Sequence, residues 1–479
     1  MLRGPADAVP AASPRERPTV AIVGSGAGGT LFAVQLLHAA TAARTSVRAV
    51  LIDRREQGGG VAYSTRDPRH RLNVTASRMS AFPSLPSHFV DWRARLGYGN
   101  APGTYASRTE YGRYLADVLA ESCRRAAPAV SLERLVAEVV AVEPTGDRVR
   151  LELADGRAVA ADLAVLALGN LGAAAPPGCE AVSAHPGFVR DPWVPGELER
   201  IVDVAADAVL LIGSGLTMVD VALSLSRSRP STRFIAMSRN GLLPRAHLPG
   251  RLAPTPAPTR VDPHISFPEL VDRTLAEAAS GNPRWHQLVD GLRPVTQAHW
   301  RRLSFEERAA FMATRHRAWS AHRHRMAPEV AGSVARLLAD GRLELHRGAP
   351  ELEIAPRGQL LLNLPGGERV ALSLAVNCTG PALDPALSTD PLVRQLLAAQ
   401  HVRPHPLGIG FDTAPGGAFR GPDGAPQSRL FTLGPPRIGE LYETTAIPEI
   451  SEQALELATR LTWRLAGESD AERVRVHTA

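Results

Sequence analysis

The stretch at residues 20–37, VAIVGSGAGGTLFAVQLL, decides the fold class of this chain. Its β-branched run predicts a buried parallel strand, which leads through a glycine turn into a helix. Gly24, Gly26 and Gly29 fit the pattern GxGxxG, in which the glycines allow a tight turn, close approach of a pyrophosphate and packing of the helix on the strand. The next strand, VRAVLID, ends in Asp53, an acid that can bind two ribose hydroxyls.

A second stretch, VLLIGSGLTMVDVALSL at residues 209–225, repeats the order of strand, turn and helix. Gly213 and Gly215 match the first two glycines, and a methionine stands at the third position. The strand that follows ends in Ser238 and Arg239, where an NAD-dependent enzyme would carry an acid. A hydroxyl and a guanidinium suit a 2′-phosphate and favour NADPH over NADH. The alternative is that the arginine is a solvated loop residue.

Each glycine turn is followed by an alternating hairpin and a returning strand that closes on a glycine. DRVRLELADGRAVAADLAVLALGN closes on Gly169, and GQLLLNLPGGERVALSLAVNCTGP closes on Gly380. Two such modules in one chain predict electron transfer between two nucleotides. We expect FAD at one module and NADPH at the other.

The composition excludes several other classes of protein. The chain of 479 residues is 44% hydrophobic, which suits two or three domains, and it has no apolar run long enough to span a membrane. It contains no lysine, which excludes ordinary pyridoxal-phosphate chemistry. The three cysteines are widely spaced, which argues against a disulfide framework or a CxxC redox pair. The net charge of +6 comes from scattered arginines, with no nucleic-acid-binding module.

Residues 1–16 are rich in Pro, Ala and Arg and lack the apolar core of a secretory signal. We expect a disordered lead to a cytoplasmic protein.

Blocks along nearly the whole chain resemble one flavoprotein family. They are GGGVAYS, RLNVTASRMSAFP, IGSGLTMVD, SRNGLLPRAH, HRHRMAP and GELYETTAIPEISEQA, together with the strands LALGN and VNCTGP and the late stretch LFTLGPP. On these blocks the chain is similar to an FAD/NAD(P)-binding family related to the N-hydroxylating and class B flavin monooxygenases. The resemblance implies a glutathione-reductase-like α/β fold, with two Rossmann-like domains and a helical insert. It also implies that the flavin carries the chemistry.

The same resemblance assigns cofactor contacts along the chain. For FAD it implies Gly24, Ser25, Gly26, Gly28, Gly29, Asp53, Arg54, Gly60, Tyr63, Leu72, Asn73, Gly434, Pro448 and Glu449. Gly380 is a further expected cofactor-binding residue, with no cofactor assigned to it. For NADPH it implies Gly213, Ser214, Gly215, Thr217, Ser238 and Arg239.

Residues 251–335 predict a helical insert that opens with a Pro-rich connector and carries several tryptophans. Arginine forks suit carboxylates, so a small anionic substrate is expected there. The candidate substrate-binding residues are Arg315, Arg323, His324 and Arg325. Two other interpretations are a solvated basic helix face over core tryptophans, and contact of HRHR with NADPH phosphates. No metal site is predicted, because His322 and His324 are two residues apart and point away from each other on a helix.

These patterns predict a discontinuous FAD-binding domain, residues 17–205 and 376–479, and an NADPH-binding domain, residues 206–375, that includes the insert. The resemblance implies N-hydroxylation of a small amino acid by O2 through an oxygen adduct at the flavin C4a carbon. L-Aspartate, oxidised as far as nitrosuccinate, is the substrate hypothesis. A reductase or dehydrogenase that does not oxygenate, and a non-catalytic FAD/NADP-binding sensor, stay open, as does homo-oligomerisation.

Overall fold

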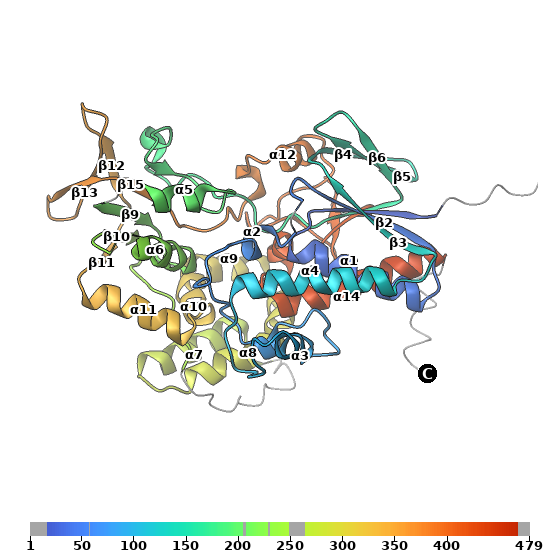
Figure 1. Cartoon of the computed structure of the whole chain (residues 1–479), viewed down its shortest axis with the longest axis horizontal. Coiled ribbons are helices and arrows are strands. Elements are labelled where there is room, and N and C mark those ends of the chain that lie inside the picture. Colours follow the sequence, from blue (N-terminus) through green and yellow to red (C-terminus); the bar gives the residue numbers. More distant parts are fainter. Residues whose placement is uncertain (1–16, 57, 205–206, 229, 249–263, 468–479) are drawn as a thin grey trace, which may run out of the picture.

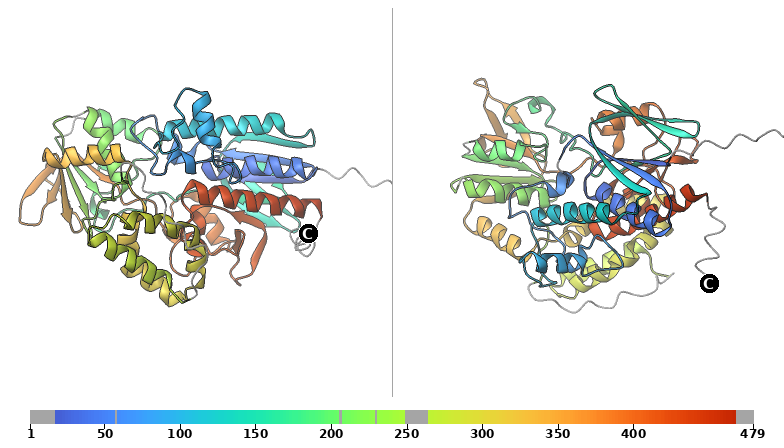
Figure 2. Two further views of the ribbon diagram at one scale, coloured as in Figure 1. Left: turned by 90° about the horizontal axis from the view of Figure 1, so that it is seen from below. Right: turned by 45° about the vertical axis from the view of Figure 1, so that its right-hand side comes forward.

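The computed structural model describes residues 17–56, 58–204, 207–228, 230–248 and 264–467 (Figure 1). The expected lead at residues 1–16 and the Pro-rich connector that opens the insert lie outside these ranges. Two sheets lie at opposite ends of the molecule, and a block of helices lies below and between them (Figures 1 and 2). No helix of the described ranges is long and apolar enough to cross a membrane.

The first sheet is built around the predicted strand and its neighbours. Its order is β16-β17-β7-β1-β2-β3, parallel throughout except for the β16–β17 pair. Every residue of β1 and β7 is buried, as expected for strands covered on both faces. The strands are β1 (Thr19–Val23), β2 (Val47–Asp53), β3 (Val130–Val136), β7 (Leu163–Leu166), β16 (Ala418–Arg420) and β17 (Pro426–Thr432).

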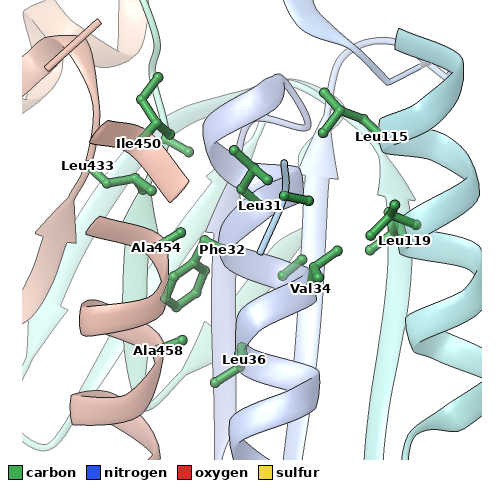
Figure 3. Close-up of a cluster of buried hydrophobic side chains, with 14 of the residues drawn as sticks. Leu31, Phe32, Val34, Leu36, Leu115, Leu119, Leu433, Ile450, Ala454 and Ala458 are labelled. Carbon is green, nitrogen blue, oxygen red and sulfur yellow. The ribbon is translucent and has the colours of Figure 1, made fainter. Parts of the chain in front are cut away.

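Three long helices cover one face of this sheet. They are α1 (Ala27–Ala42), α4 (Arg108–Arg125) and α14 (Ile447–Ala466). Figure 3 shows α1 in the middle, with Phe32 between it and α14 and Val34 on the side of α4. The first and last helices of the described chain are thus packed together, although more than 400 residues separate α1 from α14.

The other face of the sheet is covered by a meander and a short helix. The strands β4 (Val139–Thr145), β5 (Arg148–Leu153) and β6 (Ala158–Ala161) form an antiparallel sheet, and α12 (Pro391–Ala398) packs beside them. The smaller helices of this half are α2 (Gly60–Tyr63), α3 (His88–Arg95) and α13 (Ile438–Leu441).

The second sheet has the order β11-β10-β9-β15-β8, and all of its neighbours are parallel. The prediction placed residues up to 205 in the first domain, but β8 pairs with β15 and lies in the second sheet. Its two-residue length gave no sequence signal. The strands of this sheet are β8 (Phe188–Val189), β9 (Ala208–Ile212), β10 (Arg233–Ser238), β11 (Leu343–Arg347) and β15 (Leu374–Asn377). The helices of this domain are α5 (Glu197–Asp203), α6 (Leu216–Ser228) and α11 (Pro328–Ala339), and β12 (Glu351–Ile354), β13 (Leu360–Asn363) and β14 (Arg369–Leu372) form a separate antiparallel sheet.

The two sheets repeat one arrangement at their centres. Strand β9 lies between β10 and β15 as β1 lies between β2 and β7. The Gly24 N–H donates to the Ile52 carbonyl at 2.8 Å, and the Gly213 N–H donates to the Met237 carbonyl at 2.7 Å. Both glycines have positive φ, +98° and +111°. The duplicated Rossmann-like α/β fold expected from the two glycine turns is confirmed.

The helical insert is α7 (Phe267–Ala279), α8 (Trp285–Arg302), α9 (Phe305–Thr314) and α10 (His316–Arg323). Its core contains Trp300 and Trp319. It also includes Ile409 and Tyr442, which belong to the C-terminal segment of the first domain, so the insert packs on the first domain. The tryptophans are core residues, as one alternative interpretation held. The predicted insert ran to residue 335, but α11 packs instead against the second sheet.

A polar network joins the two halves directly. Arg108 of α4 forms an ion pair with Asp220 of α6 at 2.7 Å. The buried His70 Nε2 lies 2.9 Å from the Ser224 hydroxyl of the same helix. These contacts hold α6 against the first domain.

Substitution of Gly29 by alanine tests the close packing of α1 on its strand. A Cβ at Gly29 would lie 1.8 Å from the Gly24 carbonyl oxygen, so the variant should lose about 2 kcal/mol or more of unfolding free energy. Gly332→Ala on α11 is the matched control, because its added Cβ meets nothing within 4 Å. It should gain roughly 0.5 to 1 kcal/mol. Urea unfolding measures both, and equal effects would contradict the packing argument.

Candidate functional site

The predicted ribose-binding acid lies beside the first glycine turn. Asp53 stands at the end of β2 and accepts hydrogen bonds from the Ser25 N–H at 2.7 Å and the Ser25 hydroxyl at 3.0 Å. Its other oxygen accepts the Arg55 N–H at 2.9 Å. The carboxylate is therefore held at the carboxyl end of the sheet, where parallel folds bind nucleotides. Arg54, in contrast, forms an exposed ion pair with Glu138 at 3.6 Å.

A second glycine pair closes one side of this turn. Gly59 pairs with Gly26 in a short parallel bridge, and a Cβ at Gly60 would lie 2.8 Å from the Gly26 Cα. Tyr63 ends the following short helix, with its ring 4.8 Å from that of Tyr111. Burial raises the pKa of Tyr63 to about 12, so its phenol stays protonated and neutral. The predicted residues Gly60 and Tyr63 thus lie beside the GxGxxG turn.

The N-termini of α1 and α14 lie side by side. Figure 3 shows Ile450 near Leu31 and Ala458 near Leu36, so the two helices run parallel. A Cβ at Gly28 would contact Leu433 and Ile450. Helix N-termini present unpaired N–H groups and the positive end of the dipole. Two of them at the carboxyl end of β1 form a place for phosphate and for electron-rich ring oxygens.

The segment that leads into α14 is held by buried hydrogen bonds. The Gly434 N–H donates to the Gln453 side-chain oxygen at 2.9 Å, and the Gly434 carbonyl accepts the Thr444 hydroxyl at 2.9 Å. Pro448 and Glu449 occupy the first turn of α14. The predicted residues of this segment are therefore fixed next to the first glycine turn.

The second glycine turn has hydroxyls where the first has a carboxylate. The Ser214 hydroxyl lies 2.8 Å from the Ser238 hydroxyl and donates to the Leu242 carbonyl at 2.5 Å. Ser214 and Ser238 thus stand in the same relation as Ser25 and Asp53. Since this position carries no negative charge, a 2′-phosphate meets no repulsion from it. Arg239 follows and is exposed, as are Gly215 and, in part, Thr217.

Gly380 follows β15 as Gly169 follows β7. Their φ angles are +88° and +65°, and a Cβ at either would meet no atom within 4 Å. These glycines therefore serve the turn of the backbone and leave open space beside each nucleotide-binding loop.

Three segments far apart in the sequence meet between the two sheets. The His247 Nε2 lies 3.0 Å from the Asn73 carbonyl oxygen, next to the buried Leu72. Because a carbonyl only accepts, Nε2 carries the proton. The His247 N–H donates to the Met326 carbonyl at 2.9 Å, which joins this segment to the end of the insert. The quoted block SRNGLLPRAH contained His247, but without the fold nothing singled it out.

The insert candidates are separated into two places. Arg315 lies on the outside and pairs with Asp272 at 2.8 Å. Arg323, His324 and Arg325 lie together at the end of α10, where Arg323 forms a two-pronged ion pair with Glu443 at 2.8 and 3.0 Å. Both partners are buried.

The charge of each candidate arginine is balanced within the chain. Arg325 pairs with Asp290 and lies 2.9 Å from the His286 ring nitrogen. Its Nε is buried and has no hydrogen-bond partner among the described residues.

Sequence reasoning missed the inner face of α8. His286, Asp290, Arg293 and Gln297 follow helical spacing and share one face. Arg293 forms a two-pronged pair with Glu449 of α14, at 2.8 Å for one contact, and the Gln297 amide donates to the Glu443 carbonyl at 2.6 Å. The signal was present as a polar stripe in a helix flanked by tryptophans.

The buried pair with Arg293 keeps the Glu449 carboxylate charged. Burial opposes ionisation of Glu449, but the Arg293 guanidinium holds the pKa of this carboxyl below its ordinary value. Among the described ranges, no three His, Cys, Asp or Glu side chains gather as a metal ion would require.

Comparison with known proteins finds a matching domain in part of the chain and a similar fold over most of it. Residues 21–171 match the family model described as FAD-NAD(P)-binding. No curated protein matches the chain in sequence.

Several solved structures are similar over 94% of the chain. Ornithine hydroxylase from Pseudomonas aeruginosa has 16% identity, a TM-score of 0.60 and 99% of its chain covered. L-Lysine 6-monooxygenase from Pseudomonas syringae has 16% identity, a TM-score of 0.61 and 99% covered. Ornithine N-hydroxylase from Kutzneria sp. 744, with reduced FAD, NADP⁺ and L-ornithine, has 14% identity, a TM-score of 0.59 and 100% covered.

The chain has the fold of two-domain FAD- and NAD(P)-binding flavoproteins. Residues 21–171 carry an FAD/NAD(P)-binding domain. The residues at that domain fit FAD. Asp53 stands at the end of β2, where such domains carry a ribose-binding acid, and the glycine turn has no side chains that would fill the expected pyrophosphate position.

Four buried or partly buried histidines predict loss of stability in acid. Burial lowers the pKa to about 3 for His247 and His324 and to about 4 for His286 and His316. Below the ordinary value of 6.5 the unfolded chain binds protons that the folded imidazoles do not, so stability falls as the pH drops from 6.5 towards these values. Each histidine should cost about 1 to 2 kcal/mol between about pH 7 and pH 5.

Urea unfolding at the two pH values measures this loss. The variant His324→Gln should lose less stability than the original chain over the same range, and an unchanged difference would contradict the assignment.

A pair of arginine substitutions tests which candidates carry buried charge pairs. Arg323→Ala leaves Glu443 buried without its cation and should cost about 3 to 5 kcal/mol of unfolding free energy. Arg315→Ala breaks an exposed pair and should cost about 1 kcal/mol or less. Thermal and urea unfolding compare the two, and equal losses would mean that Glu443 finds another partner.

Proposed function

We propose that this chain is an FAD- and NADPH-dependent monooxygenase that N-hydroxylates a small amino acid. The proposal depends on one contact between the two domains, in which His247 of the second domain lies 3.0 Å from the Asn73 carbonyl oxygen of the first domain. Both glycine turns lie at carboxyl ends of their sheets, and electrons must pass from one nucleotide to the other in the space between. The N-hydroxylating enzymes named above share the fold, which supports the reaction class.

In this proposal the residues of the chain bind, orient and exclude water. Asp53 and the N-terminus of α1 hold the ribose and pyrophosphate of FAD, and the N-terminus of α14 faces its ring. Ser238 and Arg239 hold the 2′-phosphate of NADPH. Bound FAD supplies the redox and oxygen chemistry. The insert covers the first domain with an aromatic core, in which the rings of Trp300 and Tyr442 stack at 4.6 Å.

The substrate we propose is a small amino acid with a carboxylate side chain, L-aspartate first. The arginines at the end of α10 and on α8 are already paired with Glu443, Glu449 and Asp290, so a substrate must share a guanidinium with one of these acids. Arg325 has a spare donor, because its buried Nε lacks a partner in the described chain. An arginine has five N–H donors and can serve two carboxylates at once.

The balance of these charges also favours a second candidate. Arg293, Arg323 and Arg325 are each paired with a carboxylate of the chain, so they do not require an anionic substrate. The second candidate is therefore an NADPH-dependent reductase that passes electrons on without oxygenating a substrate. A non-catalytic sensor would keep the same nucleotide sites.

Oxygen uptake by the FAD-loaded protein with NADPH, measured with and without L-aspartate, separates these functions. We expect aspartate to raise the rate and to gain oxygen on its nitrogen, as seen by mass spectrometry. L-Malate is the matched control, because it keeps both carboxylates and lacks the amine. Peroxide as the sole product with aspartate and with a panel of amines would favour the reductase. A flavin that NADPH does not bleach would favour the sensor.

A further inference from the structure

Three exposed arginines from three different elements lie around the end of β10. They are Arg239, just after the strand, Arg317 in the first turn of α10, and Arg347 at the end of β11. Within the described chain, no carboxylate forms an ion pair with any of them. Like charges held together without counter-ions repel, so their gathering calls for a partner of opposite charge.

Sheet pairing brings Arg347 to this place. Arg347 is the register partner of Ser238 in the parallel pair β10–β11. The Gly348 N–H donates to the Ser238 carbonyl at 3.0 Å, and a Cβ at Gly241 would lie 3.7 Å from that of Arg347. The arginine is therefore fixed beside the Ser238 hydroxyl and the turn that follows it.

Backbone bonds bring Arg317 to the same place. The segment after β10 is bound to the end of α10, because the Arg245 N–H donates to the Ala321 carbonyl at 2.8 Å and the Met326 N–H donates to the Arg245 carbonyl at 2.7 Å. With α10 held there, Arg317 lies within electrostatic range of Arg239. Partial burial and the charge of Arg239 together lower the pKa of the Arg317 guanidinium.

Most arginines of the insert form an ion pair with a carboxylate. Arg273, Arg293, Arg301, Arg315, Arg323 and Arg325 each pair with a carboxylate. Arg317 is on the same block of helices and has no such pair among the described residues, although it faces another arginine.

We propose that the helical insert supplies Arg317 to the 2′-phosphate of NADP(H), and that Arg239 and Arg347 complete a three-sided site around Ser238. The inference rests on the proposed use of NADPH. A phosphate monoester carries close to two negative charges and three acceptor oxygens, which suits several guanidinium forks and a hydroxyl. Specificity for the phosphorylated nucleotide would then come from the insert as well as from the dinucleotide-binding domain.

Calorimetric titration with 2′,5′-ADP and with ADP isolates the 2′-phosphate without any turnover. Arg317→Ala should weaken binding of 2′,5′-ADP about tenfold and leave that of ADP within about twofold. Arg347→Ala and Arg239→Ala should act in the same sense. Arg317→Lys keeps the charge and should restore part of the preference. Arg273→Ala, on the exposed side of α7, is the matched control and should change neither affinity.

The outcomes separate this inference from the proposed function. An original chain that binds both ligands equally would refute the NADPH preference itself. An original chain that prefers 2′,5′-ADP, with an Arg317→Ala variant that keeps the full preference or loses both ligands equally, would refute the role of Arg317 alone. Thermal unfolding without ligand checks folding: the variant removes a repulsive charge, so its melting temperature should not fall.

Discussion

Two carbonyl oxygens, those of Ala167 and Cys378, each lie 2.6 Å from where a side chain at Gly24 or Gly213 would begin. At the end of each central strand the chain must turn between two neighbouring strands, and no other residue fits so closely at positive φ. This constraint makes the three central strands of each sheet end side by side, β1 with β2 and β7 in the first sheet and β9 with β10 and β15 in the second. The placement of Asp53 beside Ser25, and of Ser238 beside Ser214, depends on it.

The two repeats show how one scaffold accepts two different nucleotides. The N–H hydrogen bonds of Gly24 and Gly213 have nearly the same length, 2.8 and 2.7 Å, while the residue that ends the second strand changes from a carboxylate to a hydroxyl. A single substitution in the pattern thus replaces a carboxylate with a neutral hydroxyl at the same place. Because the surrounding geometry is shared, the difference in charge can act without a difference in fold.

The fold could be predicted from the sequence because its signals are local. Gly24, Gly213 and the strands that flank them carry their patterns within short windows. The surroundings of the insert could not be predicted in the same way. Arg323 meets Glu443, and Arg293 meets Glu449, across 120 and 156 residues, and nothing within a short window says which acid will neutralise which arginine. The sequence of the arginine-rich insert therefore predicts a free cationic surface, whereas most of its arginines form ion pairs within the chain.

Helix α10 has a consequence for how the two halves can move. It is eight residues long, or roughly 12 Å, and it contacts both domains along its length. Its Ala321 carbonyl accepts the Arg245 N–H of the segment after β10, while Arg323 pairs with Glu443 of the first domain. At its other end, His316 lies 2.9 Å from the Tyr442 hydroxyl of the first domain. A rotation of one domain relative to the other must therefore break contacts of this helix with one of them.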